Sequence, residues 1–82
     1  MVYACAYTDE FRKDLQTLSK ERQDAVQKKI DQIASMPQHF RFMTYEHGVQ
    51  KARIGKYRLF FRVREGVIEF LNVRKRDVAY KN

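Results

Sequence analysis

Apolar residues at the start of the chain alternate with the period of a strand and then recur with the period of a helix. Residues 2–7 are apolar apart from their tyrosines, and this short run predicts an opening strand. Thr8 can act as an N-cap, with Asp9 and Glu10 following in the first turn, where the helix dipole favours anions. A short amphipathic helix is predicted by three apolar residues at the spacing i, i+4 and i+7, namely Phe11, Leu15 and Leu18.

A second helix is predicted from Lys20 to Ser35, with Ser19 as its N-cap. Its apolar positions form a single stripe that consists of Val26, Ile30 and Ile33, supported by Ala25 and Ala34. Pro37 ends the helix, because the residue before a proline is pushed out of the helical region. We therefore expect two antiparallel helices joined by a tight turn, followed by a loop over residues 38–47 that folds back on the core.

Three antiparallel strands are expected in the second half of the chain, at about residues 49–54, 57–64 and 67–74, with turns at Gly55–Lys56 and Glu65–Gly66. In the middle strand one face consists of Tyr57, Leu59, Phe61 and Val63, and the other of Arg58, Phe60, Arg62 and Arg64. In the first of the three, Ala52 and Ile54 match the apolar face, whereas Lys51 and Arg53 join Arg58 on the opposite one.

The last strand alternates less cleanly. Leu71 and Val73 fit the apolar face, but Glu69 has the same parity, so we expect Glu69 near the strand end or at a bulge. The whole pattern predicts an α+β fold with an opening strand, a helical hairpin and three antiparallel strands. We expect the helices to pack on one face of the sheet and the other face to be open and basic.

The charges are divided unevenly between the two halves. Residues 1–40 contain six Lys/Arg and six Asp/Glu, whereas residues 41–82 contain eleven Lys/Arg and four Asp/Glu, and 11 minus 4 gives the whole net charge of +7. Because these cations occur at strand spacing, the pattern indicates a polyanionic partner for the second half, with nucleic acid the leading candidate. The alternative is a solvated basic surface that only aids solubility.

Length and composition narrow the class of protein. The 82 residues predict a single domain over 1–82 with one modest core. Cys5 is the one cysteine, so no disulfide framework or cysteine-based zinc site is expected, and we expect a cytoplasmic location. The sequence contains no apolar run of membrane length and no His or carboxylate pair with metal-ligand spacing; His39 is interpreted as a loop residue. We expect neither a metal nor another cofactor.

Two segments resemble toxins of the RelE/ParE superfamily. The first is Lys51-Ala-Arg-Ile-Gly-Lys-Tyr-Arg58-Leu, which spans the first two of the antiparallel strands, and the second is Val73-Arg-Lys-Arg76-Asp-Val-Ala-Tyr80. The likeness extends over almost the whole chain, including the opening strand and the helical hairpin that ends near a proline. The closing Arg-Asp-x-x-Tyr more nearly resembles the RelE-like branch, which has the fold of a microbial RNase, than the gyrase-poisoning branch.

The resemblance implies a metal-independent endoribonuclease of a type II toxin–antitoxin pair, which cuts messenger RNA in the ribosomal A site and so inhibits translation. In such enzymes the 2′-hydroxyl attacks the adjacent phosphate and leaves a 2′,3′-cyclic phosphate. By position, Lys51 and Arg53 match the basic pair before the turn, and Arg58 matches the arginine held against the scissile phosphate. Arg76 matches the arginine near the leaving oxygen, and Tyr80 matches the tyrosine that stacks on a base.

The residue types agree with this chemistry, with proton transfer left open. Guanidinium groups present paired donors with fixed charge to the extra negative charge of a pentacoordinate phosphate. Arginine is a poor base because it stays protonated, which makes Lys51 a better candidate than Arg53 to take the 2′ proton. Glu46 and His47 are further acid/base candidates, since some relatives use these residue types; the alternative is a polar loop before Gly48.

Other cations of this half are assigned to attracting RNA phosphates, with solvated surface charge as the alternative: Lys56, Arg62, Arg64, Arg74, Lys75 and Lys81. Phe60 either forms the surface against which the nucleotide lies or is buried beneath another segment. The implied partners are a cognate antitoxin with acidic and apolar segments, the ribosome and messenger RNA. Two other functions stay open, a non-catalytic poison of DNA gyrase on the same fold and an inactive RNA-binding remnant.

Overall fold

Residues 3–35 and 48–75 are described by the computed structural model. They form, in chain order, β1 (Ala4–Tyr7), α1 (Asp9–Gln16), α2 (Lys20–Ser35), β2 (Gln50–Ile54), β3 (Tyr57–Arg64) and β4 (Val67–Lys75). Each predicted element is present; α2 and β3 have the predicted bounds, and those of β2 and β4 differ from the predicted ones by one residue. The predicted helix stop at Pro37 and the predicted loop over residues 38–47 lie outside the described residues.

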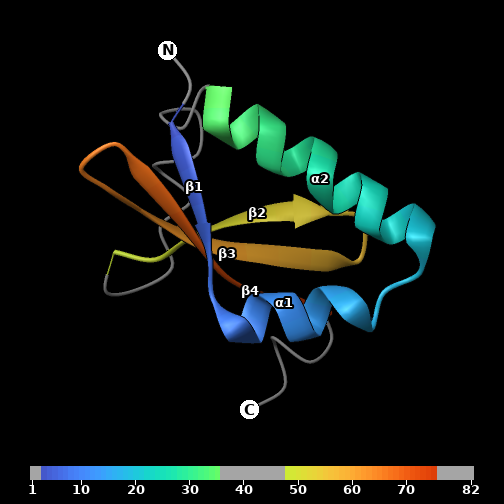
Figure 1. Cartoon of the computed structure of the whole chain (residues 1–82). Coiled ribbons are helices and arrows are strands. Elements are labelled where there is room, and N and C mark those ends of the chain that lie inside the picture. The colour runs from blue at the N-terminus through green and yellow to red at the C-terminus, as the bar shows by residue number, and fades with distance from the viewer. Residues whose placement is uncertain (1–2, 36–47, 76–82) are drawn as a thin grey trace.

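The strands form one sheet in the order β1-β4-β3-β2 (Figure 1). β2 pairs antiparallel with β3, and β3 pairs antiparallel with β4, as predicted. β1 lies parallel to β4, with Ala4 opposite Val67 and Tyr7 opposite Phe70. The predicted α+β class is therefore confirmed, and the opening strand belongs to the same sheet as the three antiparallel strands.

Both hairpin turns occur at the predicted positions. Ile54 pairs with Tyr57 across the first turn, where Gly55 has a φ of 58°. Glu65 and Gly66 of the second turn both have positive φ, at 45° and 81°, which matches a two-residue turn of type I′. These left-handed conformations favour glycine, which has no Cβ.

Both predicted N-caps are present. The Thr8 hydroxyl accepts a hydrogen bond from the backbone N–H of Phe11 at 3.0 Å, which satisfies one of the free donors in the first turn of α1. The Ser19 hydroxyl accepts one from the N–H of Arg22 at 3.3 Å, in the first turn of α2. The chain therefore enters each helix at the residue that the sequence indicates.

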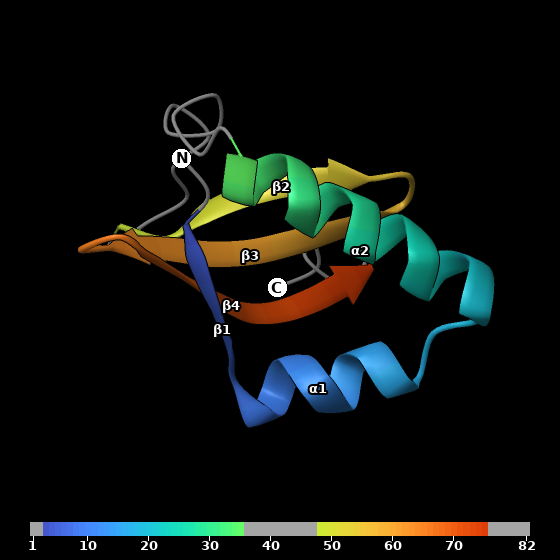
Figure 2. The same ribbon diagram turned by 45° about the horizontal axis from the view of Figure 1, so that its top comes forward.

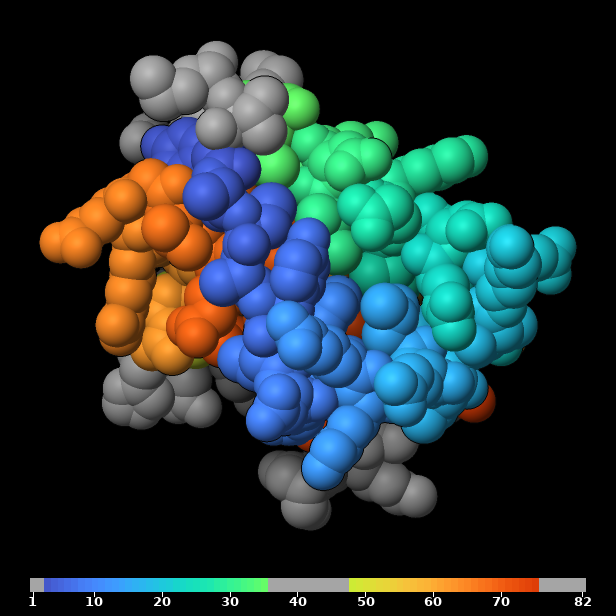
Figure 3. All heavy atoms as spheres, in the orientation of Figure 1, coloured from blue at the N-terminus to red at the C-terminus, as the bar shows by residue number. Residues whose placement is uncertain are grey.

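The core lies between the helices and one face of the sheet (Figure 2). In the space-filling view β1, α1 and α2 form most of the visible surface on this side (Figure 3). The helices contribute Phe11, Val26, Ile30, Ile33 and Ala34, and the strands contribute Ala52, Leu59, Phe61, Ile68, Phe70 and Val73. Tyr7 stacks on Phe11 and Phe70 with centroid distances of 5.4 and 5.6 Å, and burial raises the pKa of its phenol.

A bulge interrupts β4. Phe61 pairs with Phe70, but Phe60 pairs with Asn72, so Leu71 is an extra residue on β4. Val73 therefore lies in the core at 5% exposure, as predicted, whereas the prediction for Leu71 is wrong, because Leu71 is not among the buried core residues. The bulge falls at Leu71 and not at Glu69, which lies on the opposite face from the core residues Ile68 and Phe70.

Replacing Phe61 by alanine should lower the free energy of unfolding by about 3–5 kcal/mol, because the ring is fully buried and lies 5.9 Å from that of Phe70. The matched control is Val67→Thr, since Val67 is 38% exposed and threonine keeps the strand preference. Urea denaturation measures both. Equal midpoints for the two variants would contradict this placement of the core.

Candidate functional site

The far face of the sheet, defined here as the face opposite Leu59 and Phe61, carries a row of arginines. Residues paired directly across antiparallel strands place their side chains on the same face. Arg58 of β3 pairs with Arg53 of β2 on one side and with Arg74 of β4 on the other. We call these three residues the arginine row; they bring together cations that lie up to 21 residues apart in the sequence.

The next row on the far face is centred on Phe60, which pairs with Lys51 of β2 and Asn72 of β4. Lys51 and Arg53 therefore share the face of Arg58, and this predicted arrangement of the two strands is confirmed. The structure thus gathers a lysine, a guanidinium row and an aromatic ring on one surface. The lysine and the guanidinium groups can bind phosphate.

The centre of the far face is buried. Arg58 is 8% exposed and Phe60 is 9% exposed. Arg53, by contrast, has an exposed side chain and lies on β2, which is an edge strand of the sheet. The prediction of an open face is therefore wrong at Arg58 and Phe60, because both side chains are buried. A buried guanidinium acts in a medium of lower dielectric constant than water, so its attraction for an anion is stronger than that of a surface arginine.

Two carboxylates of α1 hold one end of the arginine row. The Arg74 guanidinium donates to the Glu10 carboxylate, and its Nε lies 3.8 Å from Oδ2 of Asp14. Like charges directly opposite one another on neighbouring strands are destabilising, so these carboxylates offset the repulsion between Arg74 and Arg58. Arg74 is thus ion-paired in the free protein, and its assignment to RNA binding stays a prediction.

A second ion pair lies farther along the far face. The Arg62 guanidinium is 3.4 Å from Oε1 of Glu69, its direct partner across the strands, and the two side chains are 31% and 38% exposed. Such a partly exposed pair contributes at most about 1 kcal/mol. Among the described residues 48–75, three further cations are exposed, namely Lys56 in the first hairpin turn, Arg64 at the end of β3 and Lys75 at the end of β4.

Some candidate residues lie outside the described part of the chain: Glu46, His47, Arg76, Tyr80 and Lys81. Their predicted roles therefore stay predictions. Within residues 3–35 and 48–75, no group of His, Cys, Asp or Glu side chains has the arrangement of a metal site. In the same residues, neither helix is long and apolar enough to cross a membrane.

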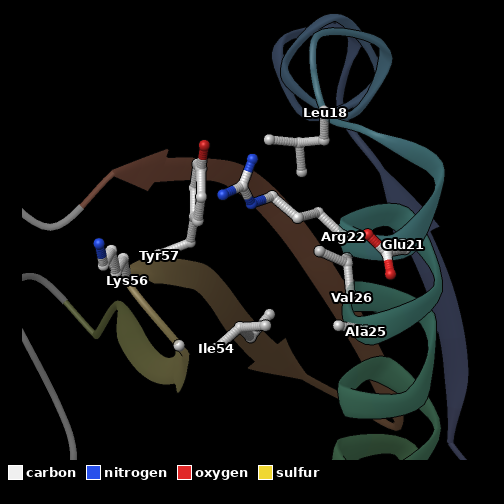
Figure 4. A pocket seen from close by; sticks show the side chains of 9 residues that line it. Leu18, Glu21, Arg22, Ala25, Val26, Ile54, Lys56 and Tyr57 are labelled. Carbon is white, nitrogen blue, oxygen red and sulfur yellow. The ribbon is translucent and has the colours of Figure 1, made fainter.

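A groove of about 440 Å³ lies away from the arginine row, between the start of α2 and the turn that joins β2 to β3. Arg22 reaches from α2 toward the ring of Tyr57, and its guanidinium carbon is 5.4 Å from the ring centroid (Figure 4). This cation–π contact ties α2 to the hairpin. The apolar lining is provided by Leu18, Val26 and Ile54.

The sequence pattern did not identify Glu10, Asp14 and Asn72 as residues near the candidate site. Glu10 and Asp14 occur on the polar side of a helix, where carboxylates usually contact water or the helix dipole. Their contacts with β4 join residues about sixty positions apart. Asn72 lies between Leu71 and Val73, so the alternation that assigned those two residues to the core left Asn72 on the far face, but it did not indicate which residue of β3 Asn72 pairs with. The bulge pairs Asn72 with Phe60.

Comparison with protein families gives one match that spans most of the chain. Residues 6–80 match the family described as the ParE toxin of the type II toxin–antitoxin system parDE. No curated protein matches the sequence.

Solved structures give matches of similar extent. A chain of the toxin–antitoxin complex RelBE2 from Mycobacterium tuberculosis has a TM-score of 0.81 and 25% identity, over 93% of this chain and 100% of that one. A mutant of the E. coli toxin RelE in the free state has a TM-score of 0.81 and 18% identity, over 96% and 88%. The chromosomal ParDE system from P. aeruginosa has a TM-score of 0.75 and 12% identity, over 90% and 96%. The last two likenesses concern the fold alone.

The arginine row predicts strongly salt-dependent binding of single-stranded RNA. Each phosphate contact should contribute about −0.7 to the slope of log affinity against log salt concentration, so Arg53→Met should make the slope less steep by about that amount. The matched control is Lys28→Met, which removes an exposed cation from α2. Fluorescence anisotropy with a labelled oligonucleotide measures both slopes. A flat salt response of the wild type would contradict a phosphate-binding face.

Proposed function

The chain belongs to the family of ParE toxins of type II toxin–antitoxin systems, in the RelE/ParE superfamily, and from this we propose that it is a ribosome-dependent endoribonuclease that cuts messenger RNA. The proposal takes residues 1–82 as a single toxin domain. It rests on the likeness of the closing segment Arg76-Asp-x-x-Tyr80 to the ribonuclease branch and on one observation in the structure. That observation is the burial of Arg58 in the middle of the arginine row.

Arg58 has the properties that stabilisation of a cleaving phosphate requires. Its guanidinium carries fixed charge and paired donors, and its low exposure removes it from competing water. The transition state of phosphate transfer carries more negative charge on its equatorial oxygens than the ground state, so a preorganised guanidinium lowers the barrier. Arg53 lies beside Arg58 on β2 and is exposed, which suits it to meet the phosphate chain as the RNA approaches.

The proposed reaction uses a group of the RNA itself as the nucleophile. The 2′-oxygen forms a bond to the adjacent phosphorus while the bond from phosphorus to the 5′-oxygen breaks. The products are a 2′,3′-cyclic phosphate and a 5′-hydroxyl. A base takes the proton of the 2′-hydroxyl, and an acid gives a proton to the leaving 5′-oxygen. Lys51 lies on the face of Arg58 and is the proposed base among the described residues.

Arg76 and Tyr80 complete the proposed site from sequence resemblance. Arg76 is assigned to the leaving oxygen and Tyr80 to stacking on a base, with Glu46 and His47 as further proton-transfer candidates. The set is rich in charge stabilisation and poor in groups that exchange protons near neutral pH. This imbalance supports dependence on the ribosome, because positioning of the messenger by the ribosome can supply the alignment that a weak base needs.

A cognate antitoxin is the proposed protein partner. The relatives from M. tuberculosis and P. aeruginosa were solved as toxin–antitoxin systems. The net charge of +7 and the cations of the far face favour a partner segment with acidic residues, which would cover the arginine row and block access of RNA.

A second candidate is a non-catalytic poison of DNA gyrase. The matched family is described by the parDE system, and this observation favours the gyrase-poisoning branch of the superfamily. A supercoiling assay with purified gyrase separates the two. Inhibition of supercoiling together with uncut messenger RNA would replace the endoribonuclease with this candidate.

Removal of the Arg58 guanidinium should slow cleavage by a factor of about a hundred or more, the usual effect of losing one preorganised donor to the transition state. Arg58→Lys should recover only part of the rate, because it keeps the charge and loses the paired donors. The measurement is a time course of new messenger 5′ ends, mapped by primer extension in a translating extract. Arg12→Ala, which removes an exposed arginine of α1, is the control. An unchanged rate in a folded Arg58→Ala protein would move the site elsewhere.

A further inference from the structure

The edge of β4 that faces away from β3, called here the outer edge, is paired with β1 over the first part of the strand and meets α1 over the last part. β1 pairs with β4 only from Val67 to Phe70 within the described part of the chain. Beyond that point α1 and its N-cap lie against the edge (Figure 2). The backbone N–H of Thr8 donates to Phe70 O at 3.1 Å, and the Thr8 hydroxyl donates to Leu71 O at 2.6 Å. Farther along, Oδ2 of Asp14 accepts from the backbone N–H of Val73 at 3.0 Å.

The backbone groups of β4 that form these hydrogen bonds belong to residues 70, 71 and 73, and this sequence of residues requires a bulge in the strand. In a regular strand the backbone groups of alternate residues point to a given edge, so the outer edge would present residues 70, 72 and 74. Here it presents Phe70, then Leu71, then Val73. The extra residue of the bulge accounts for this shift. Thr8 and Asp14 therefore bind a backbone arrangement that exists only when Leu71 is bulged.

The bulge decides which side chains reach the far face. A shift of one residue in a strand moves every following side chain to the other face of the sheet. With the bulge, Val73 enters the core at 5% exposure, and Arg74 pairs with Arg58 in the arginine row. Without it, Val73 would leave the core and Arg74 would lie on the same face of the sheet as Leu59 and Phe61, away from Arg58. The arginine row therefore forms only when Leu71 is the extra residue of the bulge.

We propose that Thr8 and Asp14 are positioning residues that hold the Leu71 bulge and thereby set the end of β4, including Arg74, on the face that carries Arg58. This inference rests on the proposed function for its effect on cleavage, and it identifies two residues of the opposite half of the chain as determinants of the site. Asp14 acts through its hydrogen bond to Val73 N–H, and the Asp14 carboxylate also faces Arg74. Thr8 acts through its hydroxyl on Leu71 O.

Substitutions can separate the hydrogen bond from the charge. Asp14→Ala removes the acceptor for Val73 N–H, whereas Asp14→Asn keeps a side-chain oxygen and removes the charge. Thr8→Val removes the hydroxyl at nearly constant shape, and with it both the bond to Leu71 O and the N-cap bond from Phe11 N–H, whereas Thr8→Ser keeps both. Asp9→Ala is the matched control, because Asp9 is an exposed carboxylate in the first turn of the same helix.

The readouts are the strand register by NMR, amide exchange at Val73, and the kcat and KM of cleavage. In Asp14→Ala we expect the Val73 amide to exchange at least about tenfold faster, as for the loss of one hydrogen bond to a charged acceptor. Cross-strand NOEs between Phe60 and Asn72 should weaken in favour of Phe60 and Leu71, and kcat should fall about tenfold with KM nearly constant. Thr8→Val should change the same quantities in the same direction. Asp14→Asn, Thr8→Ser and Asp9→Ala should keep the wild-type register.

Two results would overturn the inference. One is an unchanged register and unchanged Val73 exchange in the Thr8→Val, Asp14→Ala double variant. The other is a loss of cleavage in Asp14→Ala with the Phe60–Asn72 NOEs intact, since Asp14 would then act through its charge alone. If Asp14→Ala does not fold, Thr8→Val decides by the same readouts. If the wild type does not cut messenger RNA, the proposed function fails, while register and exchange still decide whether Thr8 and Asp14 hold the bulge.

Discussion

The side chains of a strand point alternately to the two faces of its sheet, and β4 follows this rule only up to Phe70. Leu71 then occupies an extra position opposite β3, and the alternation resumes with its phase reversed. Up to the bulge, Ile68 and Phe70 fill the core while Glu69 lies on the far face. After it, Val73 fills the core while Asn72 and Arg74 lie on the far face. Because of this one additional residue, both ends of β4 contribute apolar side chains to the core, and its C-terminal end also contributes Arg74 to the arginine row.

Placing three arginines in one row has an electrostatic cost, and the fold offsets it with two carboxylates from the first helix. Glu10 and Asp14 draw the Arg74 guanidinium toward α1, while Arg58 stays buried between its two cationic neighbours. The first forty residues have no net charge, so their effect on the site is local and comes from where these two carboxylates lie. Stability and function are linked at this edge, because Asp14 also accepts the hydrogen bond from Val73.

The sequence predicted the local features of the fold well. The N-caps Thr8 and Ser19, the two helices, and the turns at Gly55 and Gly66 all follow from interactions within a few residues, and the alternation in β3 assigned Leu59 and Phe61 to the core. The far-face placement of Lys51, Arg53 and Arg58 followed from the same alternation.

Features that depend on long-range pairing were harder to predict. The parallel pairing of β1 with β4, the position of the bulge and the burial of Arg58 each depend on segments far apart in the sequence. Strict alternation placed Leu71 in the core because nothing in the local pattern marks it as the extra residue. The position of the bulge goes together with the hydrogen bond from Val73 N–H to Asp14, which lies some sixty positions away in the sequence and comes close only in the folded chain.

The central claim is that the guanidinium groups of the far face stabilise an attack by the RNA's own 2′-hydroxyl. The most direct test uses a synthetic messenger that carries a single 2′-deoxynucleotide immediately before a mapped cut, added with the protein to translating ribosomes. The account predicts that cutting at that position stops, because the nucleophile is missing, while an all-ribose messenger is cut there. Cutting of the deoxy-substituted messenger at an undiminished rate would contradict the account, because the nucleophile would then have to be water or a group of the protein.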